Sequence, residues 1–148
     1  MDGTLVATNN KRVQLSAYRD KPTLLFFEGR HATAVNQALK DELLPWAKAH
    51  GALASVNLVA VANLTPFDFF PARQFALGAV RDIEKKIGMP ILVDFAGSLS
   101  RPPNDLPPEE STVLLLARDG SVLWRRSGTV SAADTQALFT LLDSFVTR

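Results

Sequence analysis

The stretch that decides the fold is Pro22-Thr23-Leu24-Leu25-Phe26-Phe27, followed directly by Glu28-Gly29-Arg30-His31-Ala32-Thr33-Ala34-Val35. The first six residues form an apolar run between a proline and a nearby glycine, which predicts a buried central strand. The second part turns sharply at Gly29 and continues into a long helical pattern. Ligands and reactive groups collect at the carboxyl end of a central strand that leads into a helix. We therefore expect a functional site that begins at Glu28.

The composition is that of a globular domain, and it excludes several kinds of function. The chain has 148 residues, of which 47% are hydrophobic, so we expect one domain over residues 1–148 with a substantial core. The formal net charge of +1 gives no basic surface for nucleic acid. No apolar run has the length of a membrane span.

The chain contains no cysteine. Disulfides, thiolate metal sites and thiol–disulfide exchange are therefore excluded, because each of them needs a cysteine sulfur. The lack of cysteine does not fix the compartment, since exported and cytosolic proteins can both do without it.

Apolar periodicity and turn residues predict an alternation of strands and helices. A hairpin comes first, with Asp119-Gly120 marking the turn of a second hairpin near the end. The expected elements, in chain order, are a hairpin over 5–17, a strand over 22–27, a helix ending at His50-Gly51, a strand over 56–62, a loop over 63–71, a helix over 72–87, a strand over 91–94, a proline-rich loop over 96–110, a hairpin over 112–125 and a helix from Ser131.

The predicted helices have apolar stripes that should face a sheet. In the first helix Pro45 should cause a kink or start a fresh turn. The last helix opens with a capping box from Ser131 to Asp134. The residues expected to face inward are Val35, Leu39, Leu43 and Trp46, then Phe75, Ala79 and Ile83, then Ala137, Leu138, Leu141, Leu142 and Phe145. A βαβ unit followed by an antiparallel hairpin and a closing helix predicts an α/β domain with a mixed sheet between helices.

Several stretches resemble a known group of proteins. The frame from Val13 to Pro22 looks like the entry of redoxins of the alkyl-hydroperoxide-reductase and thiol-specific-antioxidant type. Three further stretches, Glu28-Gly29-Arg30, Leu106 to Ser111 and Leu114 to Trp124, resemble the YtfJ-type proteins. These are a bacterial thioredoxin-like family without redox cysteines. The resemblance implies a thioredoxin-like fold and a redox-inactive protein.

The chain departs from the redoxin pattern at two places. Ala32 and Val35 stand where redoxins carry their cysteines. Ser111 stands where they place a cis-proline. A cis peptide bond before a residue other than proline costs about 2.5–4 kcal/mol, so we expect an ordinary trans bond at Ser111.

The resemblance implies a periplasmic protein. The first residues, Met1-Asp2-Gly3-Thr4, lack the basic patch and apolar core of a signal peptide. The chain also begins at the first hairpin, which suggests that a leader was trimmed. If Met1 is the native start, the expected location is the cytoplasm.

Polar residues at predicted strand ends form the candidate binding rim. Arg30 and His31 lie where we expect a helix entrance, which favours an anion. Unpaired main-chain N–H groups are also expected there, so an extended peptide could pair beside Ser111. The rim comprises Glu28, Gly29, Arg30, His31, Asp94, Glu110, Ser111 and Thr112.

Simpler interpretations of these residues stay open. Arg30 and His31 can be polar caps of a surface turn, as every helix has such an entrance. Glu28 can pair with Arg30 or with a neighbouring amide. Glu28, Asp94 and His31 could bind a metal ion, although nothing in their spacing demands it. We expect no metal and no cofactor.

A second candidate patch is the loop with Phe67, Phe69 and Phe70. Clustered aromatic residues on a loop are typical anchors for a protein partner. The alternative is that two of the three side chains fold back into the core.

We expect a binding or accessory module for a protein or peptide partner that uses the rim after loss of thiol catalysis. No residue is assigned a catalytic role. The alternative is an enzyme of non-thiol chemistry, or a metal-binding or small-anion-binding protein, that uses Glu28, Arg30, His31 and Asp94.

Overall fold

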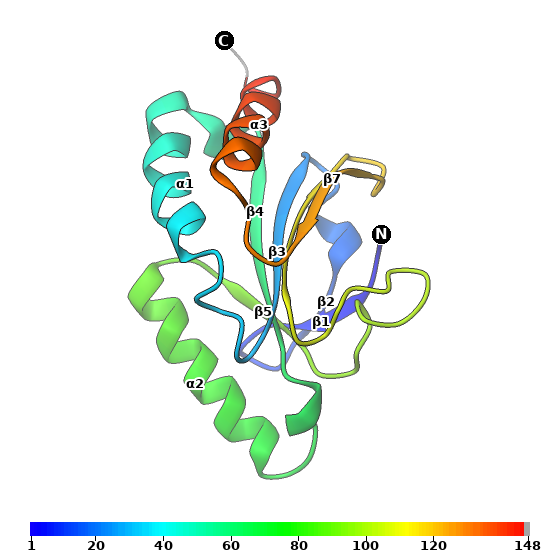
Figure 1. The fold of residues 1–148 in the computed structure, drawn as a ribbon. Helices are drawn as coiled ribbons and strands as arrows, with labels where there is room; N and C mark the ends of the chain where they lie inside the picture. The colour runs from blue at the N-terminus through cyan, green and yellow to red at the C-terminus, as the bar shows by residue number, and fades with distance from the viewer. Residues whose placement is uncertain (147–148) are drawn as a thin grey trace.

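The computed structural model describes residues 1–146, which form seven strands and three α-helices with short 3₁₀ turns (Figure 1). No helix among these residues is long and apolar enough to cross a membrane. In chain order the strands and α-helices are β1 (Thr4–Val6), β2 (Arg12–Gln14), β3 (Thr23–Gly29), α1 (Gln37–His50), β4 (Asn57–Asn63), α2 (Ala72–Ile87), β5 (Ile91–Asp94), β6 (Ser111–Leu116), β7 (Val122–Ser127) and α3 (Ala132–Asp143).

The strands form one mixed sheet in the order β2-β1-β5-β4-β3-β6-β7. Strands β3, β4 and β5 are parallel, and antiparallel pairs extend the sheet on both sides. The central strand β3 is buried along its whole length, as its apolar run predicts. The predicted βαβ unit, closing hairpin and closing helix are therefore confirmed.

All three described α-helices lie on one face of the sheet (Figure 1). Strand order explains this, because β3 to β4 and β4 to β5 are steps in the same direction and right-handed crossovers then place both helices on the same side. Helices α1 and α3 pack on Phe26 and Leu115, whereas α2 packs on Ile91 and Val93. The mixed sheet flanked by helices is therefore confirmed, although all three described helices lie on one face and do not enclose the sheet.

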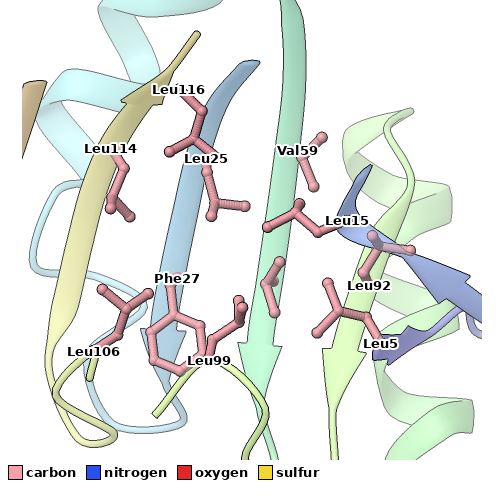
Figure 2. Packing of buried hydrophobic residues seen from close by; sticks show 11 residues of the cluster. Leu5, Leu15, Leu25, Phe27, Val59, Leu92, Leu99, Leu106, Leu114 and Leu116 are labelled. Atoms are coloured by element: carbon pink, nitrogen blue, oxygen red, sulfur yellow. The ribbon is translucent and has the colours of Figure 1, made fainter. Parts of the chain in front are cut away.

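The other face is covered by irregular chain instead of a helix. Leu15 of a 3₁₀ turn, together with Leu99 and Leu106 of the proline-rich loop, packs onto this face, and all three are buried. In Figure 2 Leu99 and Leu106 lie beside Phe27 of β3, while Leu15 lies nearer to Val59 and Leu92. The loop over 95–110 contains no helix or strand, in agreement with its proline density.

The sequence predicts the wrong inward face for α2. Phe75 is 76% exposed and Ile83 is 49% exposed, while Leu77 and Val80 are the buried residues. Leu77 and Val80 are three residues apart and the expected residues are four apart, and both spacings fit one face of a helix, so the period alone does not select the inner face.

Helix α1 also differs from the expectation. It begins at Gln37, and Val35 is exposed in the turns that precede it. Pro45 lies inside a continuous helix, so no fresh turn starts there. Gly51 ends the helix with a φ of 68°, a left-handed conformation that favours glycine. In α3, Ser131 caps the helix as predicted, but Ala137 is exposed and Phe139 is buried.

Candidate functional site

The carboxylate of Glu28 is buried at the end of β3 and has two side-chain partners. Its side chain points to the helix face of the sheet, where Lys40 Nζ of α1 lies 2.5 Å from Oε1. Ser111 Oγ, at the start of β6, donates a hydrogen bond of 2.7 Å to Oε2. Arg30, the expected partner, makes no ion pair with Glu28 in the described residues.

Asn36 extends this cluster to the loop between β7 and α3. Its Nδ2 donates to Ser111 Oγ at 2.9 Å and to the main-chain oxygen of Gly128 at 3.0 Å. The main-chain N–H of Val130 donates to Asn36 Oδ1 at 2.8 Å. The buried polar cluster of Glu28, Lys40, Ser111 and Asn36 therefore joins β3, α1, β6 and the chain before α3.

Asp94 does not converge with Glu28. The register pairs Glu28 with Ala62 and Ala62 with Val93, so Glu28 and Val93 share a face and Asp94 points to the opposite one. The fully buried Asp94 carboxylate accepts hydrogen bonds of 2.8–3.0 Å from the main-chain N–H groups of residues 97, 98 and 99. It therefore holds the turn that follows β5.

The structure does not support a metal site or a helix-dipole anion site at the rim. Within the described residues no three histidine, aspartate or glutamate side chains lie together as a metal site would require. Arg30 and His31 are not at a helix entrance, because α1 begins only at Gln37. The dipole argument for an anion at these two residues is therefore wrong.

The main chain beside Ser111 is largely paired within the protein. The oxygen of Glu110 accepts the Gly29 N–H at 3.1 Å, and the oxygen of Ser111 accepts the Gly128 N–H at 2.8 Å. Gly29 packs so closely that an added Cβ would lie 2.7 Å from the oxygen of Pro108. An extended peptide could pair with the oxygens of Glu110 and Ser111 only by displacing these bonds.

Other rim residues divide into buried and exposed ones. Thr112 is buried, with its hydroxyl 3.0 Å from Ser127 Oγ, whereas Glu110 is exposed. The cis peptide bonds of the described chain precede Pro71 and Pro103, so the bond before Ser111 is trans as expected.

The exposed part of the rim lies against the phenylalanine loop. The Arg30 guanidinium is 5.1 Å from the centroid of the Phe67 ring, and its Nε donates to His31 Nε2 at 2.9 Å. Phe69 is 60% exposed and Phe70 is 82% exposed, so the alternative that two of the three phenylalanines enter the core is wrong. We call Arg30, His31, Phe67, Phe69 and Phe70 the arginine–phenylalanine surface.

Polar contacts brace the loop that carries these phenylalanines. Arg73 forms an ion pair of 2.7 Å with Asp68 and donates to Asn10 Oδ1 at 2.9 Å. Its guanidinium also lies 4.2 Å from the centroid of the Phe95 ring. The exposed aromatic side chains are thus presented by an anchored segment.

Lys40 and Asn36 are site residues that the sequence did not reveal. Their partners Glu28 and Ser111 are 12 and 75 residues away, and no local motif links such positions. One signal was available for Asn36, since a buried amide must find hydrogen-bond partners. Its burial, however, becomes known only from the fold.

Comparisons with known proteins give a fold and no family. No family model and no curated protein sequence matches the chain. Solved structures do match, among them a putative thiol:disulfide interchange protein DsbE from Chlorobium tepidum, with 19% identity, a TM-score of 0.67, and coverage of 99% of this chain and 94% of that one. The exposed lipoprotein thioredoxin Etrx1 from Streptococcus pneumoniae has 17% identity and a TM-score of 0.61, with coverage of 97% and 99%. An uncharacterized conserved protein from Geobacillus kaustophilus has 16% identity and a TM-score of 0.70, with coverage of 99% and 79%.

The chain has a thioredoxin-like fold. At these identities the likeness concerns the fold alone. Within this thioredoxin-like domain Ala32 is buried and Val35 is exposed at the positions where the redoxin resemblance places cysteines. The thioredoxin-like scaffold is therefore present without a thiol.

Proposed function

We propose that this protein is a redox-inactive thioredoxin-like module that binds a protein partner through the arginine–phenylalanine surface. The observation that carries the proposal is the contact of Arg30 with Phe67, which makes the exposed rim and the phenylalanine loop one continuous surface. Thiol exchange requires a thiolate, and the chain has no cysteine.

The buried polar cluster supports recognition over catalysis. The carboxylate of Glu28 is shared between Lys40 and Ser111, and Ser111 Oγ also accepts a bond from Asn36. These groups bind one another inside the protein, and none of them belongs to the exposed surface around Arg30. The arginine–phenylalanine surface, in contrast, presents exposed aromatic side chains for outward contacts.

The phenylalanine loop has the properties of a binding hot spot. Aromatic and arginine side chains dominate the binding energy of many interfaces. Phe69 and Phe70 expose large apolar surfaces, and burial of such a side chain is worth about 1.5–3 kcal/mol. Because Arg73 already holds the loop through Asp68 and Asn10, binding loses little conformational freedom.

Site-specific photocrosslinking in cells of the source organism tests the proposal. A photoreactive phenylalanine analogue at position 70 should capture a defined protein partner. The same analogue at position 123, which is an exposed leucine near the opposite end of the sheet, should not. Equal capture from positions 70 and 123 would contradict the proposal. It would also be contradicted if the captured partner bound the purified Phe70→Ser variant as tightly as it binds the wild type.

We also propose a YtfJ-type protein that works in the periplasm. Support comes from the Glu28-Gly29-Arg30, Leu106 to Ser111 and Leu114 to Trp124 matches, and from a structural neighbour named as an exposed lipoprotein. Osmotic-shock fractionation of source cells that carry an epitope on the native protein tests the location. Release with a periplasmic marker is expected, and recovery with a cytoplasmic marker would refute it.

A further inference from the structure

A cavity of about 590 Å³ lies between α1 and α2, above the helix face of the sheet. Its floor includes Ala60 and Ala62 of β4, and its walls include Leu44 of α1 with Ile83 and Ile87 of α2. Figure 1 shows the two helices diverging on the same side of the sheet. This volume is in the range of small-molecule sites, which are mostly apolar with a few polar groups.

The floor of the cavity is uncovered although it lies in the middle of the sheet. Strand β4 is flanked by β3 and β5, yet Ala60 and Ala62 are only half-buried on the helix face. Ile83 and Ile87 in the wall are 49% and 48% exposed. Apolar surface left in water costs about 25 cal/mol per Å², so an apolar occupant gains by covering these side chains.

One end of the cavity is polar, and its charges select the occupant. Lys40 Nζ donates to Glu28 Oε1 and to the main-chain oxygen of Thr33, which leaves one of its three N–H donors without a partner within the described residues. The charge of Lys40 is already balanced by Glu28. Asp41, which accepts a bond from Gln37, adds a negative charge among the lining residues, so an anionic head group is disfavoured.

We infer that this cavity binds an uncharged amphipathic molecule, with its apolar body between α1 and α2 and one hydroxyl or carbonyl oxygen at Lys40. The site is separate from the arginine–phenylalanine surface, and it goes beyond the proposed function. None of the five residues of that surface lines the cavity.

The test uses the uncharged fluorophore N-phenyl-1-naphthylamine and the purified full chain. The wild type should bind one molecule of the probe with enhanced fluorescence. In competition, 1-decanol should displace it at a concentration at least tenfold lower than decanoate or decylammonium, which have the same chain length. Failure of the wild type to bind the probe, or displacement by decanoate at the concentration needed for 1-decanol, would overturn the inference.

Two matched variants locate the bound probe. Ile83→Glu puts a charge in the cavity wall and should weaken probe binding at least tenfold, whereas Val122→Glu alters a residue of similar exposure, 46%, in β7 and should leave it unchanged. Ala60→Leu fills the floor of the cavity and should abolish probe binding. If this variant does not fold, the comparison of Ile83→Glu with Val122→Glu tests the location of the probe. Phe70→Ser should bind the probe like the wild type, which separates this site from the phenylalanine loop. An equal loss of probe binding in Ile83→Glu and Val122→Glu would overturn the inference. Self-association of the wild type that Ile83→Glu abolishes would also overturn it, because a second copy of the chain would then be the occupant.

Discussion

Ser111 Oγ donates a hydrogen bond of 2.7 Å to Glu28 Oε2, and both side chains are buried. The bond connects the end of β3 to the start of β6, across 83 residues of sequence. By resemblance to redoxins, Ser111 stands where the cis-proline beside the redox site would be. In this chain the residue at that position belongs to an internal polar cluster with Glu28 and Asn36.

Asn36 should be important for stability because its buried side chain bonds the buried Ser111 hydroxyl and the partly buried main chain of Gly128 and Val130. Asn36→Ala leaves the Val130 N–H and the Gly128 oxygen without their side-chain partner. Unsatisfied buried polar groups cost about 1–3 kcal/mol each, so we expect a loss of about 2–4 kcal/mol in the free energy of unfolding, measured by urea denaturation.

Asn9→Ala provides the control for Asn36→Ala. Asn9 is exposed and its side chain accepts one hydrogen bond, from the Lys11 N–H. Surface changes of this kind stay within about 0.5 kcal/mol. Equal unfolding free energies for the two variants would show that the Asn36 bonds add nothing to stability.

The pure protein should not reduce disulfides. Reduction of insulin proceeds through a thiolate and a mixed disulfide, and this chain has no cysteine to provide either. We expect insulin turbidity and peroxide consumption to stay at the level of the assay without protein, while a cysteine-containing thioredoxin in the same assay is active. Activity of the pure chain above that background would be incompatible with the redox-inactive assignment.

The sequence predicts the strands better than the faces of the helices. Apolar runs such as Leu24 to Phe27 admit few alternatives to a buried strand, so β3 and its neighbours are found correctly. In α2 the stripe through Phe75 and Ile83 and the one through Leu77 and Val80 both have helical spacing. Which of the two stripes faces inward depends on how α2 packs on the sheet, and this packing cannot be inferred from the spacing of residues along the helix.

For the candidate site too, the sequence predicts which residues come at strand ends but not the face of the sheet to which each side chain points. Glu28 and Asp94 both come at strand ends, so the sequence places them on one rim. Their faces depend on register, and the pairing of Ala62 with Val93 puts Asp94 on the side away from Glu28. A shift of one residue reverses the face of every side chain, and local sequence patterns alone do not reveal which register two distant strands adopt.

The turn between β6 and β7 should respond to acid through Asp119. Hydrogen bonds from Ser121, first from its hydroxyl and then from its main-chain N–H, hold the pKa of Asp119 below its usual value. Because the folded pKa lies below the unfolded one, the stabilisation is present above the unfolded value, about 3.9, and is lost as pH falls through the folded pKa. Ser121→Ala should therefore raise the pKa of Asp119 in an NMR titration.

Asp20 is the internal control for the Asp119 titration. Its pKa is lowered mainly by a hydrogen bond from the Asn57 side chain, which Ser121→Ala does not touch. The Asp20 titration should therefore be the same in both proteins. An Asp119 titration that is unchanged in Ser121→Ala would rule out the hydroxyl as the main cause of the lowered pKa.

Reversing the charge of Arg30 should weaken partner binding without unfolding the protein. Arg30 is exposed, and its guanidinium lies over the Phe67 ring, where a glutamate would meet the electron-rich face of the ring instead. With the partner captured at position 70, calorimetry should show that Arg30→Glu binds roughly 1–3 kcal/mol more weakly, as for loss of a charge-assisted hydrogen bond. The melting temperature should not change. Equal binding by the wild type and Arg30→Glu, together with defective binding by Phe70→Ser, would confine the site to Phe67, Phe69 and Phe70 and remove Arg30 from it.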